Sequence, residues 1–246
     1  SNTVLTAVGH AAGVFYGYKT AGVFATDAEA ANAGAYGYLR YPTGLAQQPY
    51  RNFRAGDMHF VDQNGDGWIN EADMVVIGDP NPDIYGNIYT SLEWKNLKLD
   101  VNFKYSLGND VYNYQRMQLE SANSNWNQTT AVVNRWRYEG QVTDMPRVCD
   151  PTSESWVNNE RFSDRWIEDG SYLKLKNVRL TYKVPVNLSW LLGLSVWGEA
   201  NNVFTVSKYT GTDPEVTCGN SVLYQGIDAG YLTQSRNFNI GVTINL

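Results

Sequence analysis

Basic residues are too scarce in this sequence for a protein that binds nucleic acid. The 19 lysines and arginines are outnumbered by 25 aspartates and glutamates, and the net charge is −6. Nucleic-acid-binding domains carry a basic surface that neutralises phosphates. We therefore expect no nucleic-acid partner.

Long apolar runs, histidines and cysteines are scarce as well. No run approaches the roughly 18 apolar residues of a membrane helix. The two histidines, His10 and His59, accompany no nucleophile motif and no metal triad, so we do not expect an enzyme. Cys149 and Cys218 predict a possible disulfide in an oxidising compartment, but two separate thiols fit equally well, because spacing alone does not show that they lie within bridging distance.

Aromatic residues, in contrast, are abundant. The chain contains 17 tyrosines and 8 tryptophans, while charged residues make up only 18%. This composition suits the aromatic girdles of a membrane protein or a surface that faces carbohydrate, and it argues against disorder.

Alternation of apolar and polar residues is clearest in one predicted hairpin, residues 84–105. Side chains at alternate positions of a strand point to opposite faces, so this period of two indicates two strands. Lys95-Asn96 is the expected two-residue turn, with asparagine tolerating a positive φ. We expect four apolar side chains of the second strand to face lipid or another apolar contact and the four between them to face a polar lumen. The apolar set is Leu97, Leu99, Val101 and Phe103, and the polar set is Lys98, Asp100, Asn102 and Lys104.

The same alternation recurs in three later segments, near residues 173–184, 194–201 and 238–246. The phase changes near Asn177, which predicts a β-bulge. Short turns alternate with long connections, and residues 108–168 show no strand pattern, although 112–119 and 129–138 suit helices. An ordinary sheet with one dry face does not predict this asymmetry, whereas a transmembrane β-barrel does. The predicted fold is therefore all-β, with antiparallel strands forming a section of a large outer-membrane barrel and long loops containing short helices.

The most specific chemical motif is an aspartate-rich loop that begins at Asp62. Its spacing matches the EF-hand calcium loop, although an extended segment precedes it where the EF-hand has a helix, and Asp73 replaces the usual glutamate. The predicted ligands are the side chains of Asp62, Asn64, Asp66 and Asp73, the carbonyl of Trp68 and a water held by Asn70. The alternative is an Asn/Asp/Gly turn whose side chains bond only to their own backbone.

Several short motifs occur in the order and spacing of a known family. They are residues 13–24 (GVFYGYKTAGVF), 56–57 (GD), 62–67 (DQNGDG), 76–82 (VIGDPNP), 169–178 (DGSYLKLKNV), 201–205 (NNVFT) and 209–215 (YTGTDPE). Together they make the chain resemble the C-terminal part of the SusC/RagA-like TonB-dependent outer-membrane transporters.

A short helix is predicted at residues 26–33, before the calcium-type loop, with Thr26 as its N-cap.

The resemblance implies a role and partners. Members import oligosaccharides or peptides across the outer membrane of Gram-negative bacteria, together with a SusD-like surface lipoprotein and with energy from TonB. Residues 1–246 would then be a C-terminal barrel segment in contact with outer-membrane lipid. Its expected parts are a loop and calcium-loop region (25–83), a hairpin (84–107), a long outward loop (108–168) and closing strands (172–246). The plug domain and TonB box would lie N-terminal to this chain.

Three loop tryptophans, Trp126, Trp136 and Trp156, are candidates for stacking on a sugar substrate. The alternative is that each packs its own loop, as large aromatic side chains more often do. A second hypothesis for the whole chain is a soluble calcium-dependent carbohydrate-binding or adhesion domain.

Overall fold

The computed structural model describes residues 3–34, 37–45, 48–121, 126–153, 156–215, 217–219 and 221–246. The chain divides into two compact units, each formed by three separate stretches of sequence. The first unit comprises residues 1–80, 111–168 and 217–230, and the second comprises 81–110, 169–216 and 231–246. In the described ranges, no helix is both long and apolar enough to cross a membrane.

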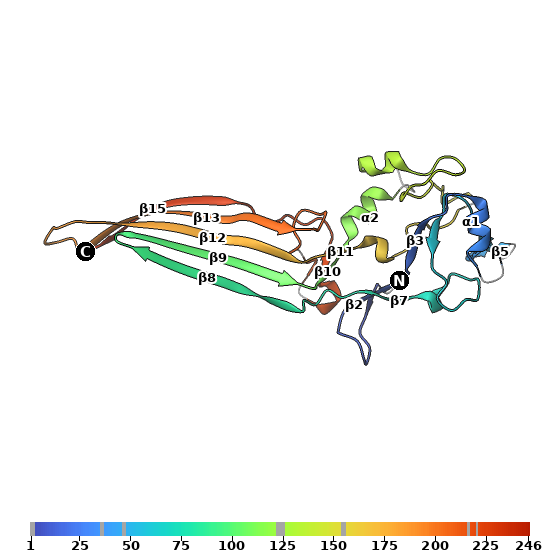
Figure 1. The fold of residues 1–246 in the computed structure, drawn as a ribbon, viewed down its shortest axis with the longest axis horizontal. Coiled ribbons are helices and arrows are strands. Elements are labelled where there is room, and N and C mark those ends of the chain that lie inside the picture. The colour runs from blue at the N-terminus through green and yellow to red at the C-terminus, as the bar shows by residue number, and fades with distance from the viewer. Residues whose placement is uncertain are drawn as a thin grey trace. The chain divides into compact units, whose positions relative to one another are not determined.

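The second unit is built on one antiparallel sheet of five long strands, which lie side by side in Figure 1. The strand order is β15-β13-β12-β9-β8. The strands are β8 (Ile84–Trp94), β9 (Leu97–Leu107), β12 (Tyr172–Val184), β13 (Gly193–Ser207) and β15 (Asn237–Asn245). The expectation of an all-β, antiparallel fold is confirmed.

The β8–β9 hairpin has the register that the alternation predicts. Trp94 pairs with Leu97 across the two-residue turn, and the pairing continues without a shift to Ile84 and Leu107. The positive φ of this turn, 51°, belongs to Lys95, whereas the sequence predicts it at Asn96. The turn therefore places its less common backbone conformation on the first of its two residues.

The predicted bulge in β12 is also present. The register against β9 shifts between Leu175 and Asn177, so Lys176 is the one extra residue on β12. On the other side of β12, strand β13 shifts at the same level, next to Asn202, which has a φ of 51°. The bulge is what lets leucines before it and valines after it share one face.

The first unit is built of short strands, short helices and turns. Its strands are β1 (Val4–Leu5), β2 (Val14–Gly17), β3 (Thr20–Val23), β4 (Arg40–Leu45), β5 (Gln48–Asn52), β6 (Met58–Phe60), β7 (Val75–Gly78), β10 (Asp110–Asn113), β11 (Ile167–Asp169) and β14 (Ile227–Asp228). One residue each of β10 and β11, Asp110 and Asp169, is assigned to the second unit. They form the sheets β1-β2-β7, β11-β10-β14, β3-β6 and β4-β5. Two buried aromatic clusters, one around Phe53 and Phe60 and one around Phe15 and Trp166, provide its core.

The helices are short. α1 (Asp27–Asn32) begins where expected, because the Thr26 hydroxyl accepts a hydrogen bond from the backbone N–H of Glu29. α2 (Tyr114–Glu120) starts two residues later than predicted, since the preceding residues belong to β10. Single 3₁₀ turns lie at Glu71–Asp73, Thr130–Asn134, Asp164–Trp166 and Val222–Tyr224.

Three sequence expectations were wrong in detail. Residues 108–168 contain β10 and the start of β11, the loop and calcium-loop region (25–83) contains the strands β4 and β5, and the helix expected at 129–138 is one 3₁₀ turn. Strands of three to six residues are too short to show an alternation in the sequence. β4 and β5 pair with each other as a local hairpin, whereas β10 pairs with β14, more than a hundred residues away along the chain.

Candidate functional site

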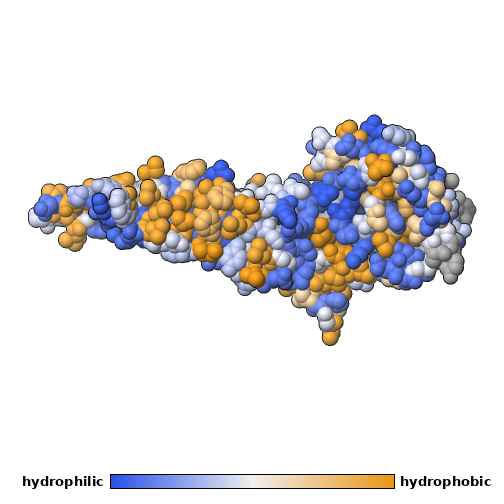
Figure 2. Space-filling view, in the orientation of Figure 1, coloured by the Kyte–Doolittle hydropathy of each residue, from blue (hydrophilic) through white to orange (hydrophobic). Residues whose placement is uncertain are grey.

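The five-stranded sheet has one face that is apolar from edge to edge. One row across it, in hydrogen-bonded register, consists of Leu92, Leu99, Leu180, Gly198 and Ile240. These side chains are largely uncovered: Ile240 is 86% exposed and Leu92 is 60% exposed. Hydrophobic atoms gather over this unit on the side visible in Figure 2. An apolar surface of this size requires an apolar environment.

The opposite face of the same sheet is polar and charged. A row one residue away consists of Ser91, Asp100, Arg179, Glu199 and Asn239. Lys98 pairs with Asp100 at 3.1 Å, and Arg179 pairs with Glu199 at 3.6 Å. The Tyr89 hydroxyl donates a 2.6 Å hydrogen bond to Asp100. Most of these charges are therefore paired within the face itself.

The strands are long enough to cross a bilayer. β8 and β9 each have 11 residues. At about 3.3 Å per residue they are about 36 Å long, and a tilt of ~40° would give a height of about 28 Å, close to the hydrocarbon core. The sheet thus has both the height and the two-faced chemistry of a barrel wall.

Trp197 lies on the polar face between a glycine and an arginine. A Cβ atom added to Gly241 on β15 would come within 2.4 Å of the Trp197 ring, which means that the ring lies against the Gly241 backbone. The Arg179 guanidinium lies 4.1 Å from the ring centroid. The glycine and the cation together hold this indole flat on the sheet.

Asparagine side chains connect three strands of the polar face near the bulge. Asn177 donates to the Oδ1 atom of Asn201 at 2.8 Å, and Asn201 donates to the Oδ1 atom of Asn237 at 2.9 Å. The Oδ1 atom of Asn102, on the next strand, has no hydrogen-bond partner among the described residues. This region of the face is polar without carrying net charge.

Residues 209–215, which follow β13, are fastened to this polar face by an ion cluster. The Lys174 ammonium group contacts both carboxylate oxygens of Asp213, at 3.0 and 2.8 Å, and Glu215 at 2.7 Å. Lys104 also pairs with Glu215, and Lys176 lies 3.5 Å from it. Burial opposes ionisation of Glu215, but the two closer lysines outweigh it and lower the pKa of its carboxyl group to about 2.

The predicted calcium loop folds as a series of tight turns in the first unit. Asp62 accepts backbone hydrogen bonds from Gly65 and Gly67, both at 2.7 Å. Asn64 accepts one from Asp66, and Asp66 accepts one from Trp68. Asp73 is completely buried and accepts from the backbone of Gln63 and Asn70, and the Asn70 side chain accepts from Ala72.

The chemistry of the loop suits calcium, but its side chains are not gathered around one point. Over the described ranges, no group of three or more His, Cys, Asp or Glu residues is placed to hold a metal ion. Burial, followed by the repulsion from Asp62 and Asp66, raises the pKa of Asp73 against the lowering effect of its backbone hydrogen bonds. An ionised carboxylate offers about four lone pairs, so these hydrogen bonds leave acceptor capacity for a cation.

The three candidate tryptophans differ in their surroundings. Trp126 is 69% exposed. Trp136 packs against the backbone of Gly56 and donates to the Ala25 carbonyl at 3.3 Å. Trp156 packs edge-on to Tyr41 beside the first aromatic cluster. The structure therefore gives Trp136 and Trp156 a packing role and leaves Trp126 as the tryptophan of the three that is open to a ligand.

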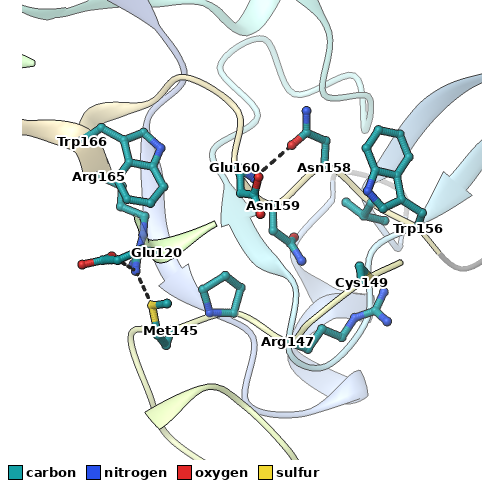
Figure 3. Close-up of a pocket in the computed structure, with 12 residues that line it drawn as sticks. Glu120, Met145, Arg147, Cys149, Trp156, Asn158, Asn159, Glu160, Arg165 and Trp166 are labelled. Carbon is teal, nitrogen blue, oxygen red and sulfur yellow. Dashed lines mark hydrogen bonds and ion pairs between the residues drawn. The ribbon is translucent and has the colours of Figure 1, made fainter. Parts of the chain in front are cut away.

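A small pocket of the first unit, about 20 Å³, lies beside Trp156, Cys149 and Arg165 (Figure 3). It has room for about one water molecule. Cys149 is buried and Cys218 half-buried, and both are thiols in this structure, the alternative that the sequence left open. Burial raises the pKa of the Cys149 thiol, which makes it a poor nucleophile.

A larger cavity of about 750 Å³ lies elsewhere in the first unit. Its walls include five aromatic rings, those of Tyr16, Tyr18, Tyr112, Tyr114 and Phe162. The volume falls in the range of small-molecule sites. This cavity was not predictable from the sequence, because its walls come from five separate segments of the chain. The aromatic run at residues 14–18 was the available signal.

Comparison with known proteins gives relatives for nearly the whole chain. No protein-family model matches it. It is 30% identical over 244 residues to the TonB-dependent receptor P3 of Formosa agariphila, a match that covers 96% of this chain and 22% of the receptor. It is also 27% identical over 223 residues to the TonB-dependent receptor SusC of Bacteroides thetaiotaomicron, covering 85% of this chain and 20% of SusC.

Solved structures agree on the fold. The RagAB peptide importer in its closed-closed state aligns with a TM-score of 0.70 and 21% identity, covering 99% of this chain and 24% of that one. Its open-open state aligns with a TM-score of 0.66 and 22% identity, covering 100% and 24%. The chain spans about a fifth to a quarter of the length of these relatives.

Proposed function

Because this chain is homologous to the TonB-dependent receptors, SusC among them, we propose that its second unit forms part of the wall of an outer-membrane transport barrel. Such receptors are outer-membrane proteins of Gram-negative bacteria, and this chain is likewise located in the outer membrane. In this proposal the apolar face of the sheet contacts lipid and the polar face lines the interior.

The observation that carries the proposal is the opposite chemistry of two adjacent rows. The row through Leu99 is apolar on all five strands, and the row through Asp100 is polar on all five. A soluble sheet buries its apolar face against other elements, whereas here that face is uncovered. Lipid on one side and a wet interior on the other satisfy both rows.

The transported substrate is proposed to be an oligosaccharide or a peptide. The relatives support nutrient import in general: one is SusC and another belongs to a complex described as a peptide importer. A SusD-like surface lipoprotein is the proposed extracellular partner, and TonB would act through a part of the receptor outside this chain. Within the chain, the aromatic cavity of the first unit and Trp126 are the surfaces that suit substrate contact.

Calcium is proposed as a structural ion of the loop that begins at Asp62. Asp62, Asn64, Asp66 and Asp73 would supply side-chain oxygens, with the Trp68 carbonyl and a water on Asn70. The ion would offset the repulsion among the three carboxylates and stiffen the turns. It would have no part in transport chemistry.

The alternative, a soluble calcium-dependent carbohydrate-binding domain, has less support. It would leave Ile240, Phe238 and their neighbours exposed to water. The matched relatives are receptors and importers, which also gives no support to an enzymatic function.

Alternate cysteine labelling along β9 tests the proposal. Single cysteines at Leu99, Val101 and Phe103, and in separate variants at Lys98, Asn102 and Lys104, would be introduced into the full-length receptor in outer-membrane vesicles. We expect a membrane-impermeant maleimide to label the second set and spare the first. Equal labelling of the two sets would contradict a wall with one lipid face.

A further inference from the structure

Two lysines face each other directly across neighbouring strands of the polar face. Lys104 on β9 and Lys174 on β12 are register partners. Like charges in this arrangement destabilise a sheet unless an anion lies between them. Glu215 is that anion, because one of its carboxylate oxygens contacts Lys104 and the other contacts Lys174.

The Lys174 ammonium group makes its hydrogen bonds to residues 209–215. Its three donor positions meet the two oxygens of Asp213 and one of Glu215, and the residue is only 2% exposed. A lysine buried to this degree requires its partners, because an isolated buried charge is very costly. Lys176, the bulge residue, adds a longer contact to Glu215 and donates to Gln234 at 2.6 Å.

The segment itself is folded compactly against the sheet. The Tyr209 ring is buried and covers Gly211, since a Cβ atom there would lie 2.4 Å from the ring. Asp213 and Pro214 are buried, while Thr212 is exposed. The backbone N–H of Tyr209 donates to the Ser207 hydroxyl, which in turn donates to the carbonyl of Ser171, the residue before β12, so the start of the segment is also attached to the sheet.

We propose that residues 209–215 form a fixed strap that folds inward over the polar face and permanently narrows the interior of the barrel, fastened by Asp213 and Glu215 to Lys104, Lys174 and Lys176. The inward direction rests on the proposed function, which makes the polar face the lumen. The attachment of the strap to the sheet does not rest on the proposed function, because it consists of ion pairs among five charged residues that all belong to the second unit. The strap is a constant part of the wall and does not open to admit substrate.

Spin labelling of the full-length receptor tests the strap. A nitroxide at Thr212→Cys, in a background with the other cysteines replaced by serine, should be immobilised in the otherwise unchanged receptor and should become mobile in Lys174→Met. Asp213→Asn with Glu215→Gln should release the label in the same way while leaving both strands intact. Lys98→Met is the matched control, because Lys98 lies on the same face but pairs with Asp100.

The outcomes separate the strap from the barrel proposal. A label that is mobile before any charge is removed, or one that stays immobile in both release variants, would overturn the strap. A label at Leu99→Cys, measured in the same receptor in lipid, reports on the wall: preferential relaxation by oxygen supports a lipid face, and preferential relaxation by a water-soluble nickel chelate argues against it. An immobilised label at Thr212 together with a water-exposed label at Leu99 would support the ion pairs that hold the strap on the sheet. It would contradict the proposal that the strap lies inside a barrel.

Discussion

Trp197 depends on the missing side chain of Gly241. Gly241→Ala would place a methyl group within 2.4 Å of the indole and force the ring off the sheet. We expect a loss of about 1–3 kcal/mol in the free energy of unfolding of the receptor, the range for an overpacked site. Denaturant titration of the folded receptor would measure it.

Gly198→Ala provides the matched control for this substitution. Gly198 lies on β13 of the same sheet, but a Cβ atom there meets no described atom within 4 Å. Its replacement should change stability by no more than a few tenths of a kcal/mol, since it adds a methyl group on the uncovered apolar face. Equal losses at the two glycines would show that the Trp197 contact does not control the result.

Glu215 makes the strap resistant to acid. Its pKa is lowered from the usual 4.5 to about 2, so its ion pairs contribute fully above pH ~4.5 and are lost as the pH falls toward about 2. Lys104, Lys174, Lys176, Tyr172 and Asp213 are the other titratable groups that face it.

The Thr212 label should therefore remain immobile from pH 7 down to about pH 4 and gain mobility only in stronger acid. In Glu215→Gln this acid transition should shrink, because the titrating carboxyl group is gone. Release of the label near pH 5 in the unsubstituted strap would contradict the role given to Glu215. Electron paramagnetic resonance line shapes across the titration would report the change.

Single residues also show where sequence reasoning reached its limit. The YTGTDPE motif of residues 209–215 was visible as a family feature, yet nothing in its spacing showed that Glu215 lies between Lys104 and Lys174. Those lysines are 111 and 41 residues away along the chain. Contacts between a loop and strands so distant in sequence follow from the register of the whole sheet.

Strands were the most predictable elements. The alternation in β8 and β9 fixed both their faces and their turn, and the phase change at Asn177 located the bulge. Long strands repeat their signal many times, whereas β10 and β11 have only four and three residues and leave none. The first unit, made of such short elements, was therefore described poorly from the sequence.

A substitution at position 101 tests which side chains of β9 face lipid. Val101→Arg would place a charge on the lipid face near the middle of the strand, and we expect it to cost about 2–4 kcal/mol in folding free energy. Asn102→Arg should be nearly neutral, because its side chain faces the interior and its Oδ1 atom has no described hydrogen-bond partner to lose. Folding into lipid vesicles across a urea series would compare the two, and equal costs would contradict the barrel wall.

Calcium binding by the loop that begins at Asp62 can be tested directly. Calorimetry with and without a chelator should detect one calcium ion bound with modest affinity, because Asp73 is shorter than the usual glutamate. Asp66→Asn should weaken binding by removing one of three carboxylates. Asp79→Asn lies outside the loop and should leave binding unchanged. No heat of binding in millimolar calcium would show that the loop is a turn held by its own hydrogen bonds.

Among the residues that the structure describes, the five-stranded sheet has two edge strands, β8 and β15, that pair with a neighbour on one side only. Hydrocarbon cannot satisfy the backbone groups of an unpaired edge strand, so this chain by itself should not form a sealed pore. Liposomes that contain only residues 1–246 should take up no more of a labelled oligosaccharide or peptide than empty liposomes do. Specific uptake would overturn the proposal that these strands are one section of a larger wall.

The order β15-β13-β12-β9-β8 also bears on how such proteins change over evolutionary time. Within this sheet every strand pairs only with the member before it and the member after it in the chain. Gene duplication or loss of one hairpin would therefore alter the circumference by two strands and leave every other pairing intact. A wall with this connectivity can be widened or narrowed by single genetic events, while the loops between its strands diverge independently.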